Sequence, residues 1–183
     1  MNDEALERLF RLYHAPLVRY LTRRLGDRDW AEEVAQETFL RALRQDTLTS
    51  ERSWLFAVAT NLVRDEARKD ERRRGRLQLL AAEERARADE RVAEDDDSAA
   101  EYDSKRAAEM ALARRAVDSL AERDRLALLM REEGLDYHEI AAAVGLSFGS
   151  VGTTLARARR RLTESFESLQ AGAQRAGGDH GAS

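Results

Sequence analysis

Apolar residues recur along this chain with the three- and four-residue spacing of amphipathic helices. The pattern predicts helices at about residues 3–13, 16–25, 30–44, 54–74, 106–120, 122–133, 137–144 and 148–169. Pro16 is expected to begin the second of these helices, because proline is tolerated in a first helical turn. Asp29, with Glu32 three residues later, is expected to cap the third helix.

Composition supports an all-α fold class. Ala, Leu, Arg and Glu dominate the 183 residues, all four are good helix formers, and proline occurs once. Between residues 77 and 105 the apolar stripes fade and acidic residues gather. We therefore expect two small helical domains, 1–76 and 106–169, joined by a flexible acidic linker at 77–105 and followed by a disordered tail at 170–183.

The distribution of charged residues along the chain indicates more about its partners than the net charge does. A net charge of −4 argues weakly against nucleic-acid binding. Basic residues nevertheless cluster at 64–76 and at 157–161, and an acidic run at 89–103 separates the two clusters. This arrangement suggests two nucleic-acid-facing modules joined by a linker of opposite sign.

The cysteine content and the hydropathy of the chain indicate the cellular compartment in which it occurs. The chain has no cysteine, which excludes disulfides and thiolate metal sites and fits a reducing compartment. Its acidic start does not resemble a secretory signal, and no stretch approaches the ~20 apolar residues that span a bilayer. We expect a cytoplasmic protein with no direct membrane insertion.

The segment from Tyr137 onward has the pattern of a helix-turn-helix. Such a motif needs a small residue where its helices cross, a turn residue that accepts a positive φ, and an apolar residue facing back. Ala141, Gly145 and Val151 occur at the required spacing. The alternative is an ordinary helical hairpin with a glycine cap. The arginines at 157–161 favour DNA binding, because guanidinium groups there can reach phosphates.

The predicted helix 30–44 has an unusual polar face. A leucine lies among its polar residues, either as a lone exposed apolar residue or as the centre of a polar-rimmed docking surface. This face holds Glu33, Gln36, Glu37, Leu40 and Arg44, with Arg41 at its edge. We call the set Glu33, Gln36, Glu37, Leu40 and Arg41 the docking face.

Three segments, in order, resemble one known family. Residues 29–44, DWAEEVAQETFLRALR, resemble the core-binding helix of the sigma-70 family, in particular its extracytoplasmic-function (ECF) sigma factors. Residues 54–73, WLFAVATNLVRDEARKDERR, resemble the promoter-melting helix that follows it. Residues 119–162 resemble the C-terminal helix-turn-helix domain of the family.

The resemblance implies the partners. Core RNA polymerase is expected to be bound through its clamp coiled coil and its flap, with the docking face against the coiled coil. Promoter DNA is the second expected partner, and an anti-sigma factor is a further candidate. Neither a cofactor nor a metal site is expected.

The resemblance also implies two sets of DNA-contacting residues. The loop 45–53 and the helix after it are expected to hold a base flipped from the minus-ten element. The residues expected at this element are Asn61 and Asp65 for base edges, with Arg64, Arg68 and Lys69 for phosphates. The residues expected at the upstream (minus-35) element are Ser150, Thr153, Thr154, Arg157 and Arg159.

The second helix of the predicted helix-turn-helix, which we call the recognition helix, departs from the family pattern. Members commonly carry Lys and Arg just after the position of Val151, whereas Gly152 and Thr154 stand there in this chain. Glycine offers no side chain to a base, and arginine pairs well with guanine. We expect weak or relaxed reading of the upstream element, or contacts supplied by a partner protein.

The sequence therefore predicts an ECF-type sigma factor that binds core polymerase and directs promoter-specific initiation. The alternative is a helix-turn-helix transcriptional regulator that acts without being a polymerase subunit. An enzyme is the least favoured class, because His14, His138 and His180 are scattered with no metal-ligand spacing.

Overall fold

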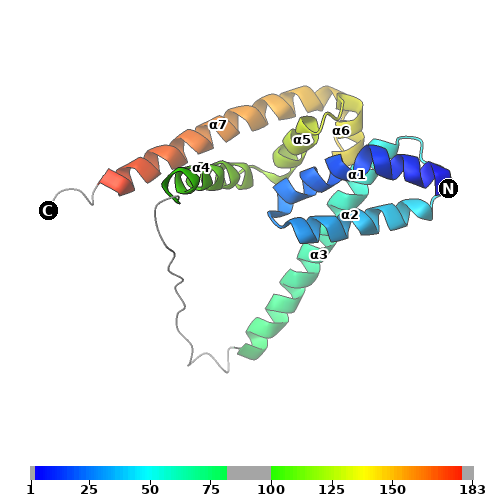
Figure 1. Cartoon of the computed structure of the whole chain (residues 1–183), viewed down its shortest axis with the longest axis horizontal. Coiled ribbons are helices and arrows are strands. Elements are labelled where there is room, and N and C mark those ends of the chain that lie inside the picture. Colours follow the sequence, from blue (N-terminus) through cyan, green and yellow to red (C-terminus); the bar gives the residue numbers. More distant parts are fainter. Residues whose placement is uncertain (1–2, 82–99, 179–183) are drawn as a thin grey trace. The chain divides into compact units, whose positions relative to one another are not determined.

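The computed structural model describes residues 3–81 and 100–178, with side chains described for residues 4–67 and 106–175. Within these ranges the regular structure is helical, which confirms the predicted all-α class. The chain divides into two compact units, Met1–Asp95 and Asp96–Ser183. Figure 1 shows helices α1 to α3 in the first unit and α4 to α7 in the second.

The first unit is a three-helix arrangement of α1 (Asp3–Leu25), α2 (Arg28–Leu43) and α3 (Glu51–Ala81). A short turn reverses the chain after α1, so α1 and α2 lie side by side and antiparallel (Figure 1). Both helices pack against α3. The fully buried side chains of this core are Leu9, Leu17, Tyr20, Leu21, Ala31, Ala35, Thr38, Ala42, Leu55, Phe56, Ala59 and Thr60.

Pro16 lies inside α1 instead of beginning a new helix. The prediction of two helices in this stretch is therefore wrong. An interior proline removes a backbone hydrogen bond and costs roughly 3 kcal/mol. Leu9 and Leu17, on either side of Pro16, are both fully buried. Their burial on one continuous face offsets the loss, because each buried leucine contributes roughly 1.5–3 kcal/mol.

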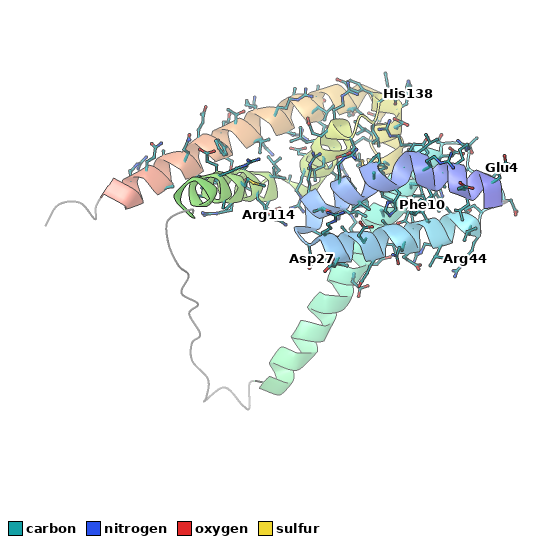
Figure 2. The ribbon with its side chains drawn as sticks, viewed as in Figure 1. Glu4, Phe10, Asp27, Arg44, Arg114 and His138 are labelled. Atoms are coloured by element: carbon teal, nitrogen blue, oxygen red, sulfur yellow. The ribbon has the colours of Figure 1, made fainter. Side chains whose placement is uncertain are left out.

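The cap of α2 is Asp27 and not Asp29, which corrects the predicted start of this helix. Gly26 has φ 77°, a backbone conformation that suits glycine, and it turns the chain just before the cap. The Asp27 side chain then accepts a hydrogen bond from the Trp30 amide at 3.0 Å. Figure 2 shows Asp27 at the turn between α1 and α2.

A buried polar contact joins α1 to α3. The Tyr20 hydroxyl and the Thr60 hydroxyl are 2.7 Å apart, and Arg24 Nη1 donates to the Thr60 carbonyl at 3.3 Å. Burial raises the pKa of Tyr20 above its ordinary value. These contacts set the rotation of α3, so that the next residue, Asn61, is exposed.

The second unit consists of α4 (Ala100–Asp118), α5 (Glu122–Glu132), α6 (Tyr137–Val144) and α7 (Phe148–Gly178). The long helix α7 packs against each of the other three. Its apolar stripe contributes Val151, Leu155 and Ala158 to the core. The other fully buried side chains of this unit are Ala116, Asp124, Leu126, Ala127, Met130, Leu135 and Ile140.

The predicted helix-turn-helix geometry is present in α6 and α7. Gly145 ends α6 in the left-handed conformation, with φ 69° and ψ 42°. Ala141 is 9% exposed and Val151 is fully buried. The axes of α6 and α7 are bent by 91°. Asp136 and Glu139 form a capping box that begins α6, with both hydrogen bonds at 2.8 Å.

Helical structure extends beyond all three predicted domain boundaries. Helix α7 continues to Gly178, so the expectation of a disordered tail is wrong for residues 170–178. Helices α3 and α4 likewise cover both ends of the expected linker. The rest of that linker, 82–99, and the tail residues 179–183 lie outside the described residues.

Across the described ranges, no single helix is long and apolar enough to cross a membrane. Within the same residues, only α6 and α7 taken together are long and apolar enough, and they form a sharply bent pair.

Candidate docking and nucleic-acid interfaces

The docking face lies on the outward side of α2. Leu40 is 51% exposed, and Glu33, Gln36 and Arg41 are exposed around it. Arg41 Nε donates to Glu37 Oε1 at 2.8 Å, which holds the rim of this face in place. The opposite side of α2 is buried, so the five predicted residues do lie together on the surface.

An apolar groove between α1 and α2 adjoins the docking face. Its volume is about 540 Å³. Leu6 and Phe10 of α1 line one side, and Phe39, Leu40 and Leu43 of α2 line the other. We call it the α1–α2 groove, and Figure 2 shows Phe10 between the two helices. Leu40 therefore belongs to a continuous apolar surface and is not a lone exposed residue.

Phe10 is held in position although it is 45% exposed. Its ring stacks on His14 with centroids 4.2 Å apart, and it lies 5.1 Å from the ring of Phe39. His14 is in turn paired with Glu32, with Nε2 and Oε2 3.2 Å apart. Aromatic rings fixed in this way present a preformed apolar surface to a partner.

The residues expected at the minus-ten element lie along α3. Asn61 and Asp65 are exposed, and Arg64 is half-buried. Arg68 and Lys69 follow in the same helix, but their side chains lie outside the described part of the chain. The four-residue spacing from Asn61 to Asp65 puts both on one face of α3.

The upstream set is only partly available to DNA. Thr153 and Arg159 are exposed and Ser150 is half-buried. Thr154 is 3% exposed, because it lies on the side of α7 that packs in the core beside Val151 and Leu155. Its expected role in reading the upstream element is therefore corrected to core packing.

Arg157 is bound to a buried carboxylate. Its Nε donates to Asp124 Oδ2 at 2.9 Å, and its Nη2 donates to Asp124 Oδ1. Arg161 lies 3.6 Å from Asp124 Oδ2. The hydrogen bond from Arg157 holds the pKa of Asp124 below its ordinary value, against the effect of burial. The predicted phosphate-gripping residue thus ties α7 to α5.

Both units match models of one family. A family model for sigma-70 region 2 matches residues 9–73, and one for sigma-70 region 4 matches residues 110–162. The ferric citrate uptake sigma factor FecI of Escherichia coli is 31% identical over 156 residues, covering 83% of this chain and 85% of FecI. The ECF sigma factor SigE of Mycolicibacterium smegmatis is 36% identical over 159 residues. This chain belongs to the ECF sigma factors.

Coverage of the ECF relatives varies. The match to SigE covers 82% of this chain but only 58% of SigE, and the match to a probable SigI of Mycobacterium tuberculosis covers 53% of that protein. The chain thus spans little more than half the length of these two relatives. A solved structure of the sigma factor RpoE, in complex with the anti-sigma factor NepR from Bartonella quintana, has a similar fold. Its TM-score is 0.56 at 22% identity, covering 90% of this chain and 98% of that one.

Three features of this ECF sigma factor were not predicted from its sequence. The contribution of Phe10 to the groove was missed because its spacing is that of a core residue. Asp124 was missed because it lies in the charged run ERDR, which is typical of a solvated face. Phe148 was treated only as the start of a helix, although it is 52% exposed.

Proposed function

We propose that this chain is the promoter-recognition subunit of a bacterial RNA polymerase, which binds core polymerase and directs initiation at its own promoters. One observation carries the proposal. Regions 2 and 4 occur in order in one chain, and region 2 presents the exposed docking face beside an apolar groove. Under this proposal the domain roles are core binding and melting for 1–76, a tether for 77–105, and upstream binding for 106–169.

The proposed site for core polymerase is the docking face together with the α1–α2 groove. An apolar centre with a polar rim is the usual anatomy of a protein interface. A groove between two helices suits a helical partner, since such a partner can lay an apolar face into it. The clamp coiled coil of polymerase is the proposed occupant, with Leu40 as the central contact and Glu33, Gln36, Glu37 and Arg41 around it. The flap is the proposed partner of region 4.

The proposed DNA contacts keep the predicted residues on α3 and revise the set on α7. Asn61 and Asp65 are proposed to read a flipped minus-ten base, with Arg64, Arg68 and Lys69 on the backbone. Upstream, the revised set is Ser150, Thr153 and Arg159, because Thr154 is buried and Arg157 is held by Asp124. A smaller polar set supports weak reading of the upstream element by hydrogen bonds.

In this role the chain binds and positions, and the phosphodiester chemistry belongs to the polymerase. Because its proposed partners, RNA polymerase and the chromosome, are in the cytoplasm, the cytoplasm is the proposed compartment. The solved relative in complex with an anti-sigma factor supports an anti-sigma factor as a further partner. Its proposed binding surface overlaps the α1–α2 groove, because occupying that groove would keep core polymerase away.

Run-off transcription tests the proposal. Core polymerase is incubated with genomic fragments, with and without the purified full chain. We expect discrete new transcripts only when the chain is present. The proposal fails if the transcripts are the same in both reactions, and binding of palindromic duplexes by a dimer of the chain alone would then indicate a regulator that acts without polymerase.

A further inference from the structure

An aromatic cluster lies exposed at the start of the recognition helix. Phe148, in the first turn of α7, stacks on His138 of α6 with centroids 4.1 Å apart and ring planes at 19°. The Tyr137 ring lies 6.4 Å from Phe148, and the Arg131 guanidinium lies 5.6 Å from the Tyr137 centroid. We call these four residues the aromatic cluster; Figure 2 shows His138 beside the start of α7.

The cluster stands where a helix-turn-helix meets DNA, because the N-terminal residues of the second helix contact base edges in the major groove. Residues 148–156, FGSVGTTLA, carry no charge. Val151 and Thr154 are buried, and Gly149 and Gly152 have no side chain. Leu155 is buried as well, so the side chains that remain to face a base are Phe148, Ser150, Thr153 and Ala156, of which Phe148 is the largest apolar one.

Each of the two hydroxyls already has a hydrogen-bond partner beside it and keeps capacity for a further hydrogen bond to a base. Thr153 Oγ1 donates to the Ser150 carbonyl at 3.0 Å, and the Ser150 hydroxyl is hydrogen-bonded to that of Ser147. Phe148 is thus the largest exposed group at this end of α7, and its stacking on His138 fixes its orientation. A Cβ built at Gly149 would meet nothing within 4 Å, so the backbone beside Phe148 is open to close approach.

The apolar group that the major groove offers is the C5 methyl of thymine, and phenylalanine is among the side chains that contact it. Charge favours DNA over a protein as the occupant. Arg159 is exposed further along α7, where it can face a phosphate, and the exposed Arg160 lies beside it with its Nε 3.6 Å from Glu164 Oε1. We propose that Phe148 reads a thymine methyl in the upstream element, so that this sigma factor selects an A·T pair by apolar contact. The inference rests on the proposed function and identifies the specificity residue of region 4.

A methyl-deletion experiment tests this assignment with holoenzyme reconstituted from core polymerase and the full chain. Transcribed templates are first selected from a promoter library whose upstream element is randomised. Each thymine of the selected element is then replaced by deoxyuracil, which lacks only the methyl group. For the wild type we expect one enriched thymine whose replacement lowers promoter affinity about fourfold, the effect of roughly one buried methyl group.

The Phe148→Ala holoenzyme should lose both the enrichment and the response to deoxyuracil, while Phe148→Leu should keep part of each. Met110→Ala is the matched control, because Met110 is 66% exposed on α4 of the same unit. Thermal melting of each variant shows that region 4 remains folded. The inference is overturned if Phe148→Ala keeps the same thymine and the same response. It is also overturned if that variant weakens core binding with DNA preference unchanged, which would make the cluster a protein contact. Failure of all holoenzymes to form would instead reject the proposed function.

Discussion

Asp124 and Arg157 form a two-hydrogen-bond ion pair that joins α5 to the recognition helix across 33 residues of sequence. Asp124 is fully buried, while the side chain of Arg157 is 42% exposed. Arg161, one turn further along α7, adds a second positive charge beside the carboxylate. Since a buried carboxylate is stable only when it is paired, the pair fixes the orientation at which α7 leaves the core.

Replacing Asp124 by Asn should destabilise the second unit. The substitution removes the ionised acceptor of Arg157, and losing a hydrogen bond to a charged group costs about 1.5–3 kcal/mol. Native-state hydrogen exchange of amides in α5 and α7 measures the change in unfolding free energy. Asp118→Asn is the control, because Asp118 is 43% exposed and exposed ion pairs contribute roughly 0–1 kcal/mol.

The lowered pKa of Asp124 also predicts how the stability of the second unit depends on pH. Because folding lowers the pKa of Asp124, its ionised form stabilises the unit fully above the unfolded pKa, about 4. That contribution is lost as pH falls through the folded pKa. The stability difference between wild type and Asp124→Asn should therefore be constant near neutrality and shrink in acid. A difference that grows as pH falls would contradict this account of the pair.

The position of Gly152 should tolerate a side chain, and substitutions there should change helix stability and DNA reading. A Cβ at this position would meet only Tyr137 Cε2, at an ordinary contact distance of 3.6 Å. Gly152→Ala should therefore stabilise α7 by about 1 kcal/mol, through helix propensity alone. Gly152→Arg should add a preference for guanine in selected upstream elements, worth about 1–3 kcal/mol, and Gly152→Ala is its control. A lower melting temperature for Gly152→Ala would contradict the described packing.

The buried Tyr20–Thr60 contact should stabilise the first unit. Tyr20→Phe removes a hydrogen bond that is expected to contribute about 1 kcal/mol. Chemical denaturation followed in α1 and α3 measures the loss, with Tyr13→Phe on the same helix as the control. A loss of equal size in both variants would show that the hydrogen bond contributes nothing specific.

The raised pKa of Tyr20 predicts how the stability of the first unit changes at high pH. Folding raises the pKa of Tyr20, so the contribution of its neutral form is present below the unfolded pKa, about 10, and disappears as pH rises through the folded pKa. In ultraviolet titration of the folded chain, one tyrosine should ionise above the ordinary pKa of a tyrosine. Tyr20→Phe should remove this late step, and its persistence would contradict the assignment.

Local patterns predicted much of the fold, since the features concerned depend on near neighbours. The four-residue repeats of α2 placed the docking face outward, and the spacing of Gly145 from Ala141 and Val151 marked the turn of the helix-turn-helix. Helix ends were less predictable. Gly26 shifted the cap to Asp27, and the burial of Leu9 and Leu17 outweighed the helix-breaking tendency of Pro16.

The functional surfaces were predicted less completely, because they depend on contacts between distant segments. Nothing near Asp124 in sequence indicates that Arg157 will cover it. The α1–α2 groove likewise combines Phe10 with Leu40, which are thirty positions apart, so neither helix alone reveals it. Thr154 became a core residue through the rotation of α7, which the ion pair helps to set.

The central claim is that region 2 binds core polymerase through the docking face and the α1–α2 groove. The direct test is the dissociation constant of purified core polymerase for the full chain and two matched variants, Leu40→Asp and Leu12→Asp. Both leucines are 51% exposed in the first unit, but only Leu40 lines the groove. We predict tight binding by the wild type, about thirtyfold weaker binding by Leu40→Asp, as expected for an interface hot spot, and little change for Leu12→Asp. No binding by the wild type, or equal losses in both variants, would contradict the account.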